Sequence, residues 1–138
     1  EQRAKAALQG GKRNVFISFA MEDLDEVNLL RAHAKNEKSD IEFNDYSVRE
    51  PYDSERAEYI RQKITERIER ASVTVVYLSE STPQSEWVKW EVEKSLSLGK
   101  RVVAMYASDK PPSQLPAWVS EKKIGLVPWK NLADELGK

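Results

Sequence analysis

The chain has 138 residues, no cysteine and a single histidine, His33. A chain of this length fits one domain with one core, and without cysteine it can form neither disulfides nor thiolate zinc sites. The 22 basic and 23 acidic residues give a formal net charge of −1, which favours neither nucleic acids nor anionic membranes as partners. Without cysteine and with a single histidine, a metal site would have to be built mostly from carboxylates, so we expect no bound metal. The sequence shows neither a long apolar run nor a signal-peptide pattern, so we expect a cytosolic protein.

The first 13 residues differ in character from the rest of the chain. Residues 1–13, EQRAKAALQGGKR, read as a flexible or helical lead-in closed by Gly10 and Gly11. A first residue other than methionine is compatible with a domain excised from a longer protein. We therefore expect the folded domain to span residues 14–138.

Five short runs of apolar and β-branched residues predict buried strands. They are NVFISF (14–19), IEF (41–43), VTVVYL (73–78), RVVAMY (101–106) and IGLVPW (124–129). Between them, apolar residues recur at helical spacing and predict helices over 22–35, from near Ser54 to 71, over 85–98 and over 132–136. The segment SDKPPSQLPAW (108–118) is expected to be mostly loop, because it contains three prolines.

Strands that alternate with helices at this spacing predict an α/β fold with a parallel sheet and right-handed crossovers. We expect a flavodoxin-like three-layer sandwich, in which a five-stranded parallel sheet of order 2-1-3-4-5 carries helices on both faces. Ligands of such sheets bind outside the carboxyl ends of the strands, where the winding direction changes. The loops after the first and third strands should therefore line a binding crevice.

The loop after the third strand leads into STPQSEWVKWE, residues 81–91. If a helix begins near Ser85, Trp87 and Glu91 lie one turn apart on the same face. An indole beside a carboxylate suits a ligand with a planar ring and a sugar, since the carboxylate can bind hydroxyls or face developing positive charge. Two structural alternatives remain open: Glu91 as a surface glutamate paired with Lys94 or Ser95, and Trp87 as an anchor for a protein partner.

The chain resembles the TIR domain superfamily from Asn14 to Leu136, and it looks most like the bacterial antiphage-defence proteins of the Thoeris type. The matching motifs are NVFISF followed by EDLDEV, then FNDYS, IRQKITERIERASVTVVYLSES and SEWVKWE. In TIR domains that cleave NAD, the last motif opens a helix and its glutamate is catalytic. The resemblance implies that Glu91 is catalytic and that Trp87 contacts the ring, with Ser85 opening the motif and Phe19 on the nicotinamide side.

The resemblance further implies NAD as a substrate, no separate cofactor, and self-association through TIR–TIR contacts. The products would be nicotinamide with ADP-ribose or a cyclic isomer. Two loops depart from the family pattern: FAMED lacks the arginines of several NAD-cleaving relatives, and Asn44 to Asp53 lacks the usual glycine. Asp45, Tyr46 and Ser47 are then the remaining polar candidates for the rim of the substrate site.

Other functions fit parts of the same sequence. A non-catalytic TIR interaction module would use the Asn44 to Asp53 loop and exposed tryptophans to bind other TIR domains. Phe19 is equally compatible with a core position at the end of its strand. The acidic run MEDLDE resembles a receiver-domain site, but Leu78 and Ser79 stand where such a site needs an aspartate. The sequence has neither a Walker loop nor a G-x-G-x-x-G motif for a nucleoside triphosphate.

Overall fold

The computed structural model describes residues 13–36, 41–44 and 55–136. Residues 1–12 of the predicted lead-in lie outside this part, as do the predicted rim residues Asp45, Tyr46 and Ser47. The sequence predictions for those residues therefore stay predictions.

The described residues form one sheet of five strands, and every neighbouring pair is parallel. The strands lie in the order β2-β1-β3-β4-β5. Their bounds are Arg13–Ser18 for β1, Ile41–Asn44 for β2, Val73–Tyr77 for β3, Arg101–Tyr106 for β4 and Gly125–Pro128 for β5. The α/β fold with a parallel sheet, predicted from the alternation of strand and helix patterns, is confirmed.

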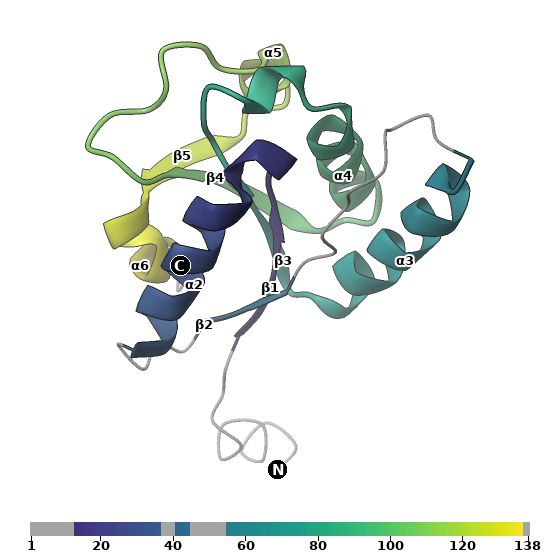
Figure 1. Cartoon of the computed structure of the whole chain (residues 1–138), viewed down its shortest axis with the longest axis horizontal. Helices are drawn as coiled ribbons and strands as arrows, with labels where there is room; N and C mark the ends of the chain where they lie inside the picture. Colours follow the sequence, from purple (N-terminus) through teal and green to yellow (C-terminus); the bar gives the residue numbers. More distant parts are fainter. Residues whose placement is uncertain (1–12, 37–40, 45–54, 137–138) are drawn as a thin grey trace.

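Five α-helices cover this sheet within the described residues. They are α2 (Leu24–Asn36), α3 (Ala57–Arg70), α4 (Glu86–Ser97), α5 (Ala117–Glu121) and α6 (Leu132–Leu136). Short 3-10 turns precede three of them, namely η1 (Met21–Asp23), η2 (Thr82–Gln84) and η3 (Trp129–Asn131). In Figure 1, α2 and α6 lie on one side of the sheet, and α3 and α4 lie on the other. Among the described helices, none combines the length and the apolar character needed to cross a membrane.

Residues 108–116 contain neither helix nor strand, so the prediction that 108–118 is mostly loop is confirmed, but helix α5, which begins at Ala117, was not predicted. Pro116 precedes the helix in an extended conformation, a position that needs no backbone N–H from the ring. The single turn that follows buries Trp118 and Val119. Burial of these side chains stabilises a helix that the nearby prolines would otherwise disfavour.

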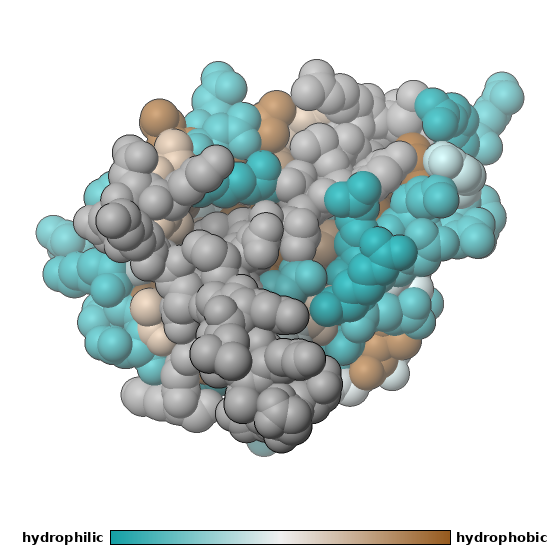
Figure 2. Space-filling view, turned by 90° about the horizontal axis from the view of Figure 1, so that it is seen from below, coloured by the Kyte–Doolittle hydropathy of each residue, from teal (hydrophilic) through white to brown (hydrophobic). Residues whose placement is uncertain are grey.

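The alternating side chains of β1 divide the core between the two faces of the sheet. Val15 and Ile17 join the cluster packed under α2 and α6. Phe16 is fully buried against α3, where Ile64 and Ile68 are fully buried as well. On the face of the molecule shown in Figure 2, the described residues are mainly hydrophilic and the hydrophobic ones are scattered.

Helix α4 begins and ends where the sequence indicates. The side chain of Ser85 accepts a hydrogen bond from the backbone N–H of Val88 at 3.2 Å and so caps the first turn. At the other end Gly99 adopts a φ of 75°, and the N–H of Lys100 donates to the carbonyl of Ser95 at 2.9 Å. These caps fix where α4 begins and ends, and Glu91 lies on the buried side of the helix with Val88 and Val92.

Candidate active site

The carboxylate of Glu91 lies between helix α4 and strand β1. Glu91 is only 4% exposed, and the hydroxyl of Ser18 donates a hydrogen bond to its Oε1 at 2.5 Å. Ser18 is the last residue of β1 and is itself buried. The alternative reading of Glu91 as an exposed surface glutamate is therefore wrong. The carboxylate is instead held at the carboxyl end of the strand, where parallel sheets bind ligands.

Trp87, one turn before Glu91, is half-buried over the contact between α4 and α3. Its ring packs against the buried cluster that contains Phe16, and it meets the ring of Trp90 edge-on at 6.3 Å. The guanidinium carbon of Arg61 lies 5.7 Å from the centre of the Trp87 ring. The indole thus has packing and cation–π contacts within the domain, and its contact with the ring of a ligand stays a prediction.

Phe19 and Ser85 are also placed by the structure. Phe19 is half-buried and packs on the core under α2, on the face of the sheet opposite to Ser18 and Glu91. Ser85 caps helix α4 through its hydroxyl oxygen. The structure therefore brings Glu91 and Ser18 together, places Trp87 on the adjoining surface of α4, and sets Phe19 on the other side of the strand end.

A second polar cluster, which the sequence analysis did not assign, joins the segment after β1 to the end of β3. The hydroxyl of Ser79 donates to Oδ2 of Asp23 at 2.5 Å, and Asp23 is 6% exposed. The phenol of Tyr77 donates to Oε1 of Glu26 at 3.0 Å. The acidic run after the first strand was the available signal, but its hydrogen-bond partners lie more than fifty positions away and could not be identified from local pattern.

The pKa values of two groups in this cluster, the Asp23 carboxyl and the Tyr77 phenol, are shifted by their surroundings. Burial, with the nearby charges of Glu26 and Glu22, raises the pKa of Asp23, while the hydrogen bond from Ser79 opposes the shift. Burial also raises the pKa of Tyr77 above its ordinary value of 10.0, and the Glu26 carboxylate adds to that effect. Tyr77 therefore remains a protonated donor to Glu26 at neutral pH.

Asp23→Asn is expected to change how stability depends on pH. Because the folded-state pKa of Asp23 lies above its ordinary value of 3.8, the folded protein binds more protons than the unfolded chain in the window between the two. The contribution of Asp23 to the free energy of unfolding therefore falls as pH rises through that window. The Asp23→Asn variant lacks this contribution of Asp23. The free energy of unfolding of the variant minus that of the parent should therefore increase with pH and then level off. Urea denaturation of both proteins from about pH 4 to 7 measures the difference, and a decrease with pH would contradict the account.

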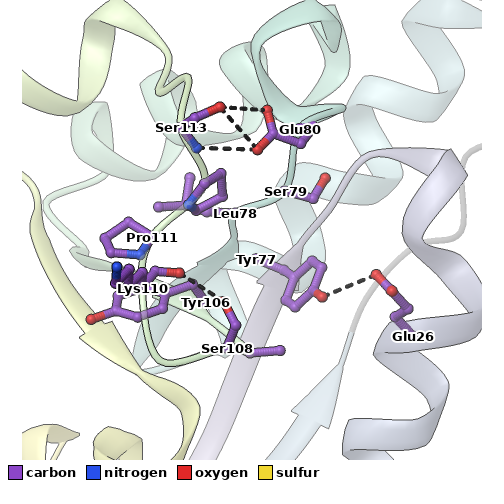
Figure 3. Close-up of a pocket in the computed structure, with 12 residues that line it drawn as sticks. Glu26, Tyr77, Leu78, Ser79, Glu80, Tyr106, Ser108, Lys110, Pro111 and Ser113 are labelled. Atoms are coloured by element: carbon purple, nitrogen blue, oxygen red, sulfur yellow. Dashed lines mark hydrogen bonds between the residues drawn. The ribbon is translucent and has the colours of Figure 1, made fainter.

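A pocket of about 420 Å³ opens at the carboxyl ends of β3 and β4 (Figure 3). Its walls include Tyr77 and Tyr106, the last residues of these strands, together with Glu26 of α2. Tyr77 belongs to the core under α2, so the pocket opens on the α2 side of the strand ends, whereas Glu91 faces β1 from the α4 side. Within the described part of the chain, no group of three or more histidine or acidic side chains is placed to hold a metal.

Comparison with solved structures finds the same fold in two transferases and in the TIR domains of a resistosome. A 2-deoxyribosyltransferase from Bacillus psychrosaccharolyticus is similar with a TM-score of 0.62 and 14% identity, over 88% of this chain and 90% of that one. A 2-desoxiribosyltransferase from Leishmania mexicana has a TM-score of 0.50 and 17% identity, over 81% and 72% of the two chains. The TIR domains of the activated Roq1 resistosome, which recognises the effector XopQ, have a TM-score of 0.50 and 18% identity, over 90% and 69%.

At these identities the structural likeness shows the fold alone. No curated protein matches the sequence. Residues 16–111 match the family described as Thoeris protein ThsB, TIR-like domain, which agrees with the resemblance found in the sequence motifs. This match spans more than half of the chain and includes the end of β1 together with α2, β2, α3, β3, α4 and β4. The chain therefore belongs to the TIR-like domain family of the Thoeris antiphage-defence protein ThsB.

Proposed function

We propose that this TIR-like domain binds NAD and cleaves the bond between nicotinamide and ribose. Nicotinamide leaves, and the ribose carbon then bonds either to water, which gives ADP-ribose, or to an atom of the same ADP-ribose unit, which gives a cyclic isomer; the products form in the bacterial cytoplasm as part of antiphage immunity. The observation that carries the proposal is the buried Glu91 carboxylate, held by Ser18 at the carboxyl end of β1 within the segment that matches the family.

The chemistry asks little of the protein beyond one well-oriented carboxylate. The nicotinamide ring of NAD carries a positive charge and leaves as a neutral molecule, so the departure needs no general acid. Positive charge develops on the ribose as the bond breaks, and a carboxylate stabilises that charge most strongly in a site from which water is excluded. Glu91 is buried, and Ser18 fixes the orientation of its carboxylate.

The remaining predicted residues complete the substrate site in this proposal. Trp87, one helical turn from Glu91, contacts the planar ring, and Phe19 contacts the nicotinamide side. Ser85 positions Trp87 and Glu91 by capping α4, the helix that carries both residues. Asp45, Tyr46 and Ser47 supply the polar rim. NAD is the substrate, no further cofactor takes part, and self-association through TIR–TIR contacts assembles the active form.

Nicotinamide release measured by chromatography tests the proposed reaction. Purified protein is incubated with NAD at a low and at a high protein concentration, and the sugar-containing product is identified by mass. We expect turnover that rises more steeply than protein concentration, because association completes the site. Absence of nicotinamide release at every concentration, with folded protein that self-associates, would reject the enzymatic function.

A non-catalytic interaction module is the second candidate, and one observation favours it. Glu91 lies in the contact between α4 and β1, while the pocket at the ends of β3 and β4 is lined by other residues. A module of this kind should self-associate without consuming NAD. Size-exclusion chromatography with light scattering, on the parent and on Trp90→Ala or Tyr46→Ala, would then show loss of assembly, while no protein in the series releases nicotinamide.

A further inference from the structure

The pocket at the ends of β3 and β4 has a firmly held wall. The carboxylate of Glu80, just after β3, accepts a hydrogen bond from the backbone N–H of Ser113 at 3.1 Å and another from its hydroxyl. This contact ties the loop after β4 to the loop after β3 (Figure 3). Within the same loop, the hydroxyl of Ser108 donates to the carbonyl of Lys110 at 2.7 Å. The loop after β4, which bounds the pocket, is therefore held by a hydrogen bond within the loop and by hydrogen bonds to Glu80.

The lining combines flat apolar surfaces with hydrogen-bond acceptors. Tyr77 and Leu78 are buried at the carboxyl end of β3. Tyr106 and Pro112 are half-buried around the opening of the pocket. Glu26 points into this space from α2 and is oriented by the phenol of Tyr77 (Figure 3). An aromatic or heterocyclic ring can pack against tyrosine and proline, and a hydroxyl or amino group of the same ligand can donate to the Glu26 carboxylate.

The charges around the pocket select against phosphate. Glu26 and Glu80 both line it, with Lys110 as the cationic side chain among its lining residues. Asp23 lies beside it through its hydrogen bond to the lining residue Ser79. Two carboxylates and one exposed ammonium give this rim a net negative charge, which repels an anionic ligand. The volume of about 420 Å³ falls within the range of small-molecule sites.

We propose that this pocket is a second small-molecule site that binds an unphosphorylated nucleoside. The heterocyclic base packs against Tyr106 and Pro112, and a sugar hydroxyl donates to Glu26. The pyrophosphate of NAD is disfavoured here, so the site is separate from the one proposed at Glu91. The two sites lie on opposite faces of the strand ends, and the nucleoside site does not depend on NAD cleavage.

A nuclear magnetic resonance titration with adenosine tests the site and locates it. We expect saturable binding with a dissociation constant of about 0.1 to 1 mM, as suits a ligand of this size. The backbone amides of Ser79 and Ala107 should shift, while that of Val92 in α4 should not. Glu26→Gln should weaken binding by about tenfold or more, because a neutral amide accepts a weaker hydrogen bond than a carboxylate. Tyr106→Leu should weaken it through loss of the flat ring.

Matched controls separate this site from the active site and from non-specific stacking. Tyr59→Leu changes an exposed tyrosine on α3 and should leave adenosine binding unchanged. Glu91→Gln should also bind adenosine like the parent. Adenosine 5′-monophosphate should bind more weakly than adenosine. The proposal is overturned if no probe binds, if the monophosphate binds as tightly as adenosine, or if the Glu26 and Tyr106 variants bind adenosine like the parent.

Discussion

Glu91→Gln is expected to lower the rate of nicotinamide release by about a hundredfold or more. The amide has nearly the same size as the carboxylate and can still accept a hydrogen bond from Ser18, which donates to Oε1 in the structure. It carries no negative charge, however, and cannot stabilise positive charge on the ribose. Initial rates at saturating NAD, measured for parent and variant at equal protein concentration, give the ratio directly.

Glu93→Gln is the matched control for this change. Glu93 lies two residues further along α4 and is exposed, so the substitution removes the same charge from the same helix without touching the buried site. Its nicotinamide release should equal that of the parent. Thermal unfolding of both variants shows whether each remains folded. Equal rates for the parent and a folded Glu91→Gln would remove Glu91 from the reaction.

Phe16→Ala is expected to lower the free energy of unfolding by about 3 to 5 kcal/mol. Phe16 is fully buried in β1, and its ring packs against Ile60, Ile64 and Ile68 of α3. Truncation removes the apolar contacts and leaves a cavity between the sheet and two helices, which the surrounding side chains fill only in part. Because native domains are stable by only about 5 to 15 kcal/mol, much of the stability would be lost.

Urea denaturation followed by tryptophan fluorescence measures this loss. Phe16→Leu keeps most of the apolar volume, and we expect it to be clearly less destabilised than Phe16→Ala. Tyr59→Ala, at a 49% exposed position of the same helix α3, should change stability by no more than about 0.5 kcal/mol. A Phe16→Ala protein as stable as Tyr59→Ala would contradict the described packing of α3 on β1.

Local sequence pattern was sufficient to predict most elements of the fold. The buried strands are short runs of apolar residues, and the helices bury apolar residues that recur at helical spacing. The run VTVVY is buried at every position of β3, as a strand covered on both faces must be. The stripe Ile60, Ile64 and Ile68 similarly marks the buried side of α3. Helix α5 was not predicted, because a single turn among prolines owes its stability to the burial of Trp118 rather than to local preference.

The site could be predicted only where its residues are close in sequence. The spacing of Trp87 and Glu91, together with Ser85 as the cap, follows from one helix and its start. The hydrogen-bond partner of Glu91 could not be predicted from local spacing, because Ser18 lies 73 positions away in the sequence. The same holds for Asp23 and Ser79, which are 56 positions apart. Such pairs depend on strand order and register, which place the ends of β1 and β3 side by side.

A crystal structure of the Glu91→Gln protein with NAD bound is the most direct test of the proposed reaction. We expect a hydroxyl of the nicotinamide-bearing ribose to lie within about 3.2 Å of an oxygen or nitrogen of the side chain at position 91. We also expect the nicotinamide ring to lie beside the end of β1. NAD bound at a distance from position 91, with the Ser18 contact unchanged and no ribose atom within hydrogen-bond distance, would contradict it.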